Sequence, residues 1–179
     1  TIDLIVATFE HTCDTALGFK PARQRIVDTI GLPLGDALEL LSDIHEEERI
    51  LELRQIYGAF NAANHDIMIK PIPGVTELLP KLKERGIKLA VVTSKKAYML
   101  ERGMQCLGML PYIDTTVSVL DTERGKPAPD PMLLACERLG LAPRECLCVG
   151  DSPFDLQSGN AAGCVTVAVE YTQLNWQSL

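Results

Sequence analysis

Aromatic residues, basic residues and long apolar runs are scarce in this sequence of 179 residues, and each shortage excludes a class of protein. Four Phe, four Tyr and one Trp are too few for a surface that stacks nucleic-acid bases. The 17 Lys and Arg residues against 24 Asp and Glu residues give a net charge of -7, which argues against a nucleic-acid partner that needs a basic face. No apolar run approaches the ~20 residues that span a bilayer, so we expect no membrane partner.

Signals for secretion and for stabilisation by disulfides or metals are also absent. No Lys or Arg precedes Lys20, so the start of the sequence lacks the charge pattern of a signal peptide. The six cysteines form no Cys-x-x-Cys pair, and the three histidines lack metal-ligand spacing. With 46% apolar residues the chain can build a core without cross-links. We therefore expect a cytoplasmic protein with reduced thiols, whose oligomeric state the sequence leaves open.

The first 70 residues predict helices and no strands. Apolar residues between Ile2 and Leu17 recur at three- and four-residue steps, which is one face of a helix, and Gly18 ends the run. The segment Lys70-Pro71-Ile72-Pro73-Gly74 is typical of a linker because its prolines and glycine interrupt a helix. We therefore place a helical domain at residues 1–71. Further helices are expected in it over residues 22–30, 34–41 and after Asp43.

Strand and helix patterns alternate after the linker. β-branched apolar runs separated by helices predict an α/β fold with a doubly wound parallel sheet, which we assign to residues 72–179. The runs are apolar at consecutive positions, so we expect both faces of the sheet to be covered. The expected strands are 88–93, 116–120, 146–150 and 165–169, and the helices between them include 98–107, 130–139 and 153–162.

Polar residues follow the apolar runs at the points where strands should end. Thr93 and Ser94 come after the first run, Asp151 and then Asp155 come after the third, and Lys126 lies in a rigid Gly-Lys-Pro-Ala-Pro-Asp loop. Ligands of open parallel sheets bind at the carboxyl ends of the strands, so we expect these side chains at one edge. A lysine and a threonine hydroxyl suit a phosphoryl group, and two carboxylates suit Mg²⁺. The pattern indicates phosphoryl-transfer chemistry.

Each of these residues taken alone has a structural alternative. Thr93 could cap the end of a strand, Asp151 could cap the helix that begins near Pro153, and Lys126 could be a solvated surface lysine. The combination, in this order and with each residue after a strand or loop, favours a functional site over these alternatives.

The same segments resemble the haloacid dehalogenase superfamily of hydrolases, in its phosphatase branch. Thr93-Ser94-Lys95 is similar to the second motif of that family, the loop around Lys126 to the third, and Gly-Asp-Ser-Pro-Phe-Asp at 150–155 to the fourth. Ile-Gly-Leu-Pro-Leu at 30–34 resembles a cap segment of phosphoglycolate phosphatases and related pyrophosphatases. The resemblance implies that the helical domain is a small cap on an α/β core.

The resemblance also implies an activity, which is Mg²⁺-dependent hydrolysis of a small phosphorylated metabolite through a phospho-aspartyl intermediate. Thr93 and Lys126 would be catalytic residues that hold the phosphoryl group, and Ser94 would help to bind the substrate. Asp151 would bind Mg²⁺, and Asp155 would support the metal, either directly or through water and Lys126. Phosphoglycolate is the leading substrate, ahead of pyrophosphate and sugar phosphates. A phosphosugar mutase of the same fold and an inactive, truncated paralogue that acts as a binding module are the alternatives.

One motif of the family is missing from the sequence. Asp-x-Asp-Gly-Thr supplies the nucleophile and the general acid, and no such pattern occurs. The helical period through Ile2, Ile5 and Phe9 argues against a decayed copy at 7–12, so we expect Thr1 to correspond to the position just after the motif. On that expectation the 179 residues lack the nucleophile and are inactive, and the sheet lacks a central strand, which leaves two unpaired edges.

Overall fold

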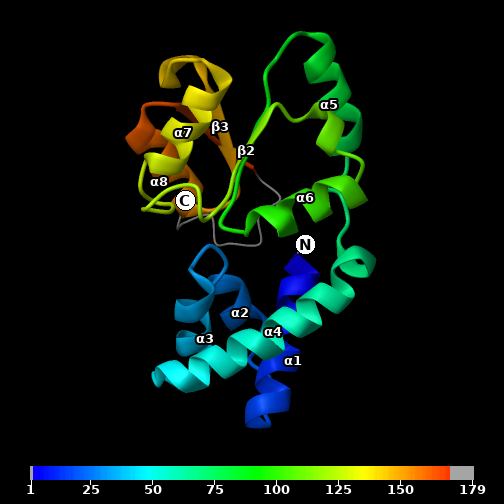
Figure 1. Ribbon diagram of the computed structural model, residues 1–179, viewed down its shortest axis with the longest axis vertical. Coiled ribbons are helices and arrows are strands. Elements are labelled where there is room, and N and C mark those ends of the chain that lie inside the picture. The colour runs from blue at the N-terminus through cyan, green and yellow to red at the C-terminus, as the bar shows by residue number, and fades with distance from the viewer. Residues whose placement is uncertain (1, 170–179) are drawn as a thin grey trace. The chain divides into compact units, whose positions relative to one another are not determined.

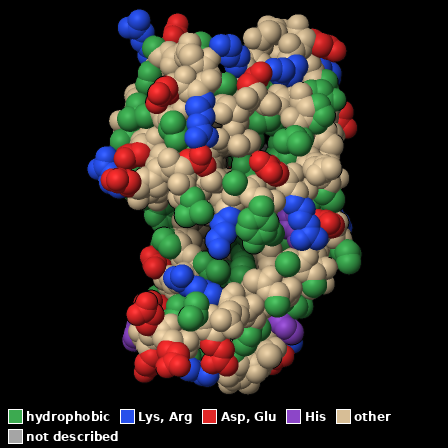
Figure 2. All heavy atoms as spheres, viewed as in Figure 1, with side chains coloured by type: hydrophobic (Ala, Val, Ile, Leu, Met, Phe, Trp, Pro, Cys, Tyr) green, Lys and Arg blue, Asp and Glu red, His purple; other side chains and the backbone are tan. Residues whose placement is uncertain are grey.

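A computed structural model describes residues 2–169, and the chain divides into two compact units between Lys70 and Pro71. The division lies one residue before the boundary that the linker predicts. The first unit consists of helices, and the second alternates helices with short strands (Figure 1). Among the described residues no helix is both long and apolar enough to cross a bilayer. Acidic and basic side chains are intermixed on the face shown in Figure 2.

The helical unit is built on the packing of its first helix against its last. The ring of Phe9 meets the edge of the Tyr57 ring, with the two centroids 4.9 Å apart. Gly18, with a φ of 76°, ends the first helix in the left-handed conformation that glycine adopts without strain. Leu38 and Leu53 are 0% and 1% exposed, so the unit has a closed apolar core. Its helices are α1 (Ile2–Leu17), α2 (Arg23–Asp28), α3 (Leu34–Ser42) and α4 (Glu47–Met68).

Over residues 71–169 the second unit has four helices, two 3-10 turns and four strands. The helices α6, α7 and α8 match the predicted segments closely, whereas every strand is shorter than predicted. The elements are α5 (Val75–Glu84), β1 (Ala90–Val92), α6 (Ala97–Cys106), η1 (Leu110–Tyr112), β2 (Thr115–Val117), α7 (Asp130–Leu139), η2 (Pro143–Glu145), β3 (Leu147–Gly150), α8 (Pro153–Ala162) and β4 (Val165–Ala168).

The strands form two parallel pairs instead of one continuous sheet. β1 pairs with β2, and β3 pairs with β4, in registers that place Ala90 beside Thr115 and Leu147 beside Val165. The α/β class is confirmed, and so is the parallel direction. Within residues 2–169 each strand has one hydrogen-bonded neighbour, so β1 and β3 both present an unpaired edge.

One expectation about the strands is wrong, namely that both faces are covered. α7 packs against β1, β2 and α8, and α8 packs against β3 and β4. The opposite face of β3 and β4 is open, because Leu147, Val149, Val165 and Val167 are 60%, 57%, 58% and 43% exposed. Alternate residues of a strand point to opposite faces, so these four share one surface. An apolar run in the sequence indicates that a strand favours burial on both faces. It does not show which element, if any, packs against each face.

Candidate active site

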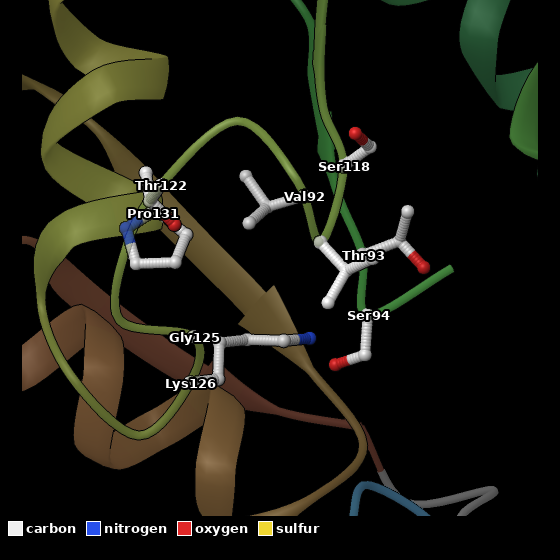
Figure 3. Close-up of a pocket in the computed structure, with 9 residues that line it drawn as sticks. Val92, Thr93, Ser94, Ser118, Thr122, Gly125, Lys126 and Pro131 are labelled. Atoms are coloured by element: carbon white, nitrogen blue, oxygen red, sulfur yellow. The ribbon is translucent and has the colours of Figure 1, made fainter. Parts of the chain in front are cut away.

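A small hollow opens at the carboxyl ends of β1 and β2, beside the loop that leads into α7. It is shallow and open to solvent, and its enclosed part has a volume of about 10 Å³, close to the space that one water molecule needs. Figure 3 shows the ammonium of Lys126 reaching toward Thr93 and Ser94 across this space. The lining residues are Val92, Thr93, Ser94, Ser118, Val119, Thr122, Gly125, Lys126 and Pro131.

Thr93 is held at the point where β1 ends. Its backbone N–H donates to the Val117 carbonyl at 2.9 Å, which continues the strand pairing by one residue. Its Oγ1 accepts a hydrogen bond from the backbone N–H of Lys95 at 3.2 Å. The hydroxyl hydrogen of Thr93 is therefore left to donate to an oxygen of a ligand in the hollow.

A hydrogen-bond network fixes the end of β2. The Asp121 carboxylate accepts from the backbone N–H of Ser118 at 2.7 Å, from the Ser118 hydroxyl, and from the Arg138 guanidinium at 2.7 Å. Arg138 also donates to the Thr116 carbonyl. The hydrogen bonds from Ser118, followed by that from Arg138, lower the pKa of Asp121 to about 2. This network ties α7 to one wall of the hollow, and the sequence reasoning missed it.

The loop that carries Lys126 is anchored on both sides. Arg124 forms an ion pair with Asp130 at 3.0 Å, at the start of α7. The Ser158 hydroxyl, on α8, donates to the Ala128 carbonyl at 2.6 Å. The peptide bond between Lys126 and Pro127 is cis. Two helices therefore set the path of the loop, as the rigid proline-rich sequence predicts.

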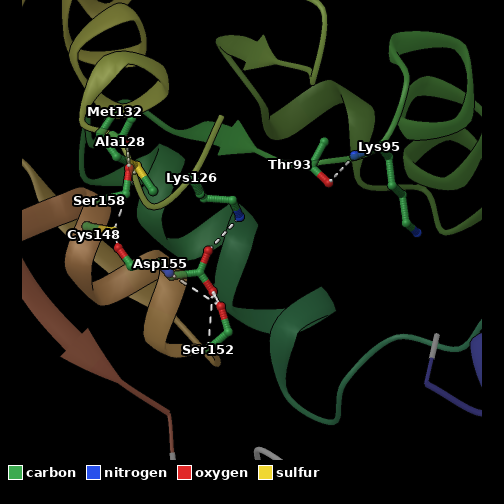
Figure 4. A network of polar contacts seen from close by, with 9 residues as sticks. All are labelled: Thr93, Lys95, Lys126, Ala128, Met132, Cys148, Ser152, Asp155 and Ser158. Carbon is green, nitrogen blue, oxygen red and sulfur yellow. Dashed lines mark hydrogen bonds and ion pairs between the residues drawn. The ribbon is translucent and has the colours of Figure 1, made fainter. Parts of the chain in front are cut away.

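Lys126 and Asp155 form the central ion pair of the site. Lys126 Nζ lies 2.6 Å from Asp155 Oδ1, and the two side chains are only 13% and 11% exposed. Figure 4 shows the pair together with Ser152, while the side chain of Lys95 points away from it. Burial alone would raise the pKa of Asp155, but the Lys126 charge and the hydrogen bonds from Lys126 and Ser152 hold that pKa below its usual range. Asp155 is therefore ionised and keeps the ammonium in position.

Ser152 caps α8, so the alternative that Asp151 caps this helix is wrong. The Ser152 hydroxyl accepts from the Asp155 backbone N–H at 3.3 Å and donates to Asp155 Oδ2 at 2.7 Å. The Ser152 N–H also donates to Oδ2, at 3.1 Å. The spacing Ser-x-x-Asp is that of a capping box, a signal in the sequence that would have identified this arrangement. Both oxygens of Asp155 are thus already engaged.

Gly150 is required by the same arrangement. A Cβ added at Gly150 would lie 2.3 Å from the Asp155 Cβ and 2.9 Å from its Cγ. Only a residue without a side chain lets the first turn of α8 fold back over the end of β3. The close approach of Asp155 is therefore a steric reason for glycine at position 150.

Asp151 follows β3 directly and is exposed. Partial desolvation, and then the negative charge of Asp155, raise the pKa of Asp151, while the Lys126 charge acts in the opposite direction. Two carboxylates in mutual repulsion suit a cation, and Mg²⁺ usually takes one or two carboxylates together with water and substrate phosphate. The residues therefore fit such an ion. Within the described part of the chain no group of three or more His, Cys, Asp or Glu side chains could hold a metal by itself.

The structure brings the predicted site residues together. Thr93, Ser94 and Lys126 line one hollow, and Asp155 contacts Lys126. The charge of Lys126 acts on Asp151, which places these two groups in the same site. Among residues 2–169, no carboxylate lines the hollow.

Comparisons with known proteins point to one family. The sequence profile of the haloacid dehalogenase-like hydrolases matches residues 1–169. The chain is 40% identical over 179 residues to the PpaX protein of Clostridium perfringens, which covers 100% of this chain and 82% of that protein. Pyrophosphatase PpaX of Halalkalibacterium halodurans is 35% identical over 171 residues, or 96% of this chain and 78% of that protein. A haloacid dehalogenase-like structure from Bacteroides fragilis superposes with a TM-score of 0.91 at 24% identity, over 99% of this chain and 84% of that one.

Proposed function

Because the chain belongs to the haloacid dehalogenase-like hydrolase family, we propose that its hollow binds the phosphoryl group of a small phosphorylated compound for hydrolysis in the cytoplasm. The observation that carries this proposal is the Lys126–Asp155 pair at the rim of the hollow. A buried ammonium held by a carboxylate on one side presents its remaining hydrogens to an anion on the other.

In this proposal, different residues of the hollow bind different parts of the phosphoryl group. Lys126 offsets the negative charge of the phosphoryl oxygens, and Thr93 donates its hydroxyl hydrogen to one of them. Ser94 lies beside Thr93 and offers a hydroxyl and a backbone N–H. Asp155 does not touch the substrate and acts by orienting Lys126. In this proposal Thr93 and Lys126 are catalytic residues, and Ser94 is a substrate-binding residue.

Asp151 would hold Mg²⁺ in this proposal, with Asp155 supporting it through Lys126. A bound Mg²⁺ supplies positive charge that stabilises the transferring phosphoryl group. Asp151 supplies an exposed carboxylate at the end of β3, and a cation there would offset the repulsion between Asp151 and Asp155, which adds to partial desolvation in raising the pKa of Asp151. Of the two ways in which Asp155 could support the metal, we favour the indirect one, because both oxygens of Asp155 already accept hydrogen bonds.

The nucleophile is the part that these 179 residues do not supply in our proposal. The sequence has no Asp-x-Asp-Gly-Thr segment, and in the described part of the chain no carboxylate lines the hollow. Lys126 and Thr93 can bind and neutralise a phosphoryl group, but neither is placed to attack phosphorus. We therefore propose that residues 1–179 bind phosphate without turning over a phosphoester.

The substrate proposal rests on the relatives. Proteins named pyrophosphatase PpaX match this chain over nearly its whole length, for example at 35% identity over 171 residues. We therefore place pyrophosphate ahead of phosphoglycolate, the substrate that the sequence resemblance put first. Both compounds carry a terminal phosphoryl group and a second anionic group.

Binding of inorganic phosphate to the 179-residue protein tests the hollow directly. We expect titration calorimetry to detect binding that weakens at least about tenfold in Lys126→Met, because one charge-assisted contact is lost. Lys81→Met is the matched control, since Lys81 is exposed on α5 and outside the hollow. Equal losses in both variants, or no loss in Lys126→Met, would overturn the proposal.

Turnover is tested with a longer protein that includes an in-frame Asp-x-Asp-Gly-Thr segment before Thr1. With Mg²⁺ we expect it to hydrolyse pyrophosphate, phosphoglycolate or an aryl phosphate, while residues 1–179 do not. In the longer form Asp151→Asn should remove most activity, by about 10²-fold, the scale on which losing one electrostatic stabiliser slows an enzyme. Unchanged Mg²⁺ dependence of activity in that variant would show that Asp151 does not hold the metal.

A further inference from the structure

Three thiols meet at the end of the β3–β4 pair that lies away from the hollow. Cys136 Sγ on α7 is 3.9 Å from Cys164 Sγ, and its thiol also contacts that of Cys146. Cys136 is 4% exposed, whereas Cys146 and Cys164 are half-buried. All three are free thiols.

The strand register fixes where this cluster lies. Cys146 directly precedes β3 and Cys164 directly precedes β4, and the Val165 N–H donates to the Cys146 carbonyl at 3.1 Å. The thiols therefore sit at the amino ends of the two parallel strands, while Asp151 follows the carboxyl end of β3. Oxidation of the cluster would not place any atom in the hollow.

We propose that Cys136 and Cys164 form a redox-sensitive dithiol, a modification site that low-molecular-weight disulfides convert into an intramolecular disulfide. The two sulfurs lie 3.9 Å apart, and an S–S bond would bring them to ~2.05 Å. The bond would join α7 to the start of β4. Cys13 and Cys106 lie outside the cluster and take no part. Cys148 faces the cluster, and its charge acts on Cys164, but its thiol contacts Met132 Sδ and the Asp155 carbonyl.

The chemistry is a pair of exchange steps. The Cys164 thiolate attacks one sulfur of the small disulfide, whose S–S bond breaks and releases one small thiolate. The Cys136 thiolate then attacks Cys164 Sγ, which forms the protein disulfide and expels the second small thiolate. The protein loses two electrons and two protons, and the small disulfide is reduced to two thiols.

Access and protonation determine the order and the pH dependence of these steps. Cys136 is too buried to meet an external disulfide, so the half-buried Cys164 reacts first. Burial raises the pKa of Cys136 and of Cys164, so few thiolates are present at neutral pH. We expect the rate to rise about tenfold per pH unit above pH 7, in step with the thiolate fraction.

The test is exposure of the 179-residue protein to glutathione disulfide. Free thiols counted in denaturant should fall from six to four, and the intact mass should fall by two hydrogen atoms. Trypsin leaves Cys146, Cys148 and Cys164 in one peptide, so a second cleavage before aspartates is needed. The double digest then separates residues 130–138, 145–150 and 155–179, and a Cys136–Cys164 bond links the first of these to the last.

Two serine variants serve as a matched pair. Cys164→Ser should abolish the linked peptide, and Cys106→Ser, which changes an exposed cysteine on α6, should leave it unchanged. The unmodified protein carries the decisive measurement, so the test does not depend on a variant that folds. Peptides linked through 145–150, a glutathione adduct on Cys164 that persists without loss of a second thiol, or no reaction would each overturn the proposal.

Discussion

The helical unit and the α/β unit differ in how completely they cover their apolar side chains. Leu38 and Leu53 in the helical unit are almost inaccessible to solvent, whereas Val149 and Val165 in the α/β unit are more than half exposed. Helices bury a stripe against a neighbouring helix within a few residues of chain, but a strand needs a neighbour on each edge and a layer on each face. The unit that carries the candidate site is therefore the one whose strands have exposed apolar side chains and unpaired edges.

In the α/β unit, short-range polar contacts position the candidate site, although its strands are short and partly exposed. The hollow is held by hydrogen bonds and ion pairs between loops and helices, as in the contacts of Asp121 with Ser118 and of Lys126 with Asp155. These bonds act over short distances and do not need a wide sheet. The local geometry of the site is thus compatible with short strands.

Core substitutions provide the largest contrast between the units. We expect Leu38→Ala in α3 to lower the free energy of unfolding by about 2–5 kcal/mol, because it leaves a cavity in a closed core. Val149→Ala in β3 should cost less than about 1 kcal/mol, since the Val149 side chain is already mostly in water. Urea unfolding followed by circular dichroism measures both. Equal costs would show that the exposed face of β3 is covered in solution.

Two glycine substitutions give a contrast of opposite sign. Gly150→Ala should destabilise the protein by about 1–3 kcal/mol and weaken phosphate binding, because the new Cβ displaces Asp155 from Lys126. Gly58→Ala, within α4 and with open space around its Cβ position, should stabilise it by about 0.5–1 kcal/mol. Thermal melts and phosphate titrations of both variants test this pair. If Gly150→Ala binds phosphate normally, the close contact with Asp155 is not needed for the site.

The smallest expected effect concerns pH and the end of β2. The pKa of Asp121 is about 2 when folded and 3.8 in the unperturbed residue, so its stabilising contribution is complete above pH 3.8 and is lost as pH falls through about 2. We expect Asp121 to contribute at most about 1 kcal/mol to the free energy of unfolding, because its ion pair with Arg138 is partly solvated. The difference in stability between the protein and Asp121→Asn, measured from pH 6 to pH 2, should shrink at the acid end. A constant difference would contradict this role.

The helices were predictable from the sequence because their signals are local. Gly18 ends α1, and α7 and α8 span the predicted residues. Strand pairing depends on segments far apart in the chain, so the expected run of 116–120 shortened to β2 at Thr115–Val117, where Ser118 turns to bind Asp121. The burial of β3 and β4 was mispredicted for the same reason, since no local pattern specifies a covering layer.

The site was predictable in its residues and less so in its contacts. Sequence order placed Thr93 and Asp151 at strand ends and Lys126 in the loop before α7, where the structure has them. The resemblance left open whether Asp155 acts on the metal directly or through water and Lys126. The sequence did not show that one oxygen of Asp155 accepts from Lys126 and the other from Ser152, because these contacts depend on the distance between two loops. Arg138 was not foreseen for a similar reason: a lone arginine on a helix carries no spacing signal.

The two contacts of α8 with the Lys126 loop have a mechanical consequence. Asp155 holds the side chain of Lys126, and Ser158, about one turn further along the same helix, holds the carbonyl of Ala128. The loop is thus attached to α8 at two points, and a rotation of the loop relative to this helix would break at least one of the two contacts. An anion that draws Lys126 toward the hollow would pull on α8 as a whole, and the helix would transmit that displacement along its axis to Ala162, next to the strand β4.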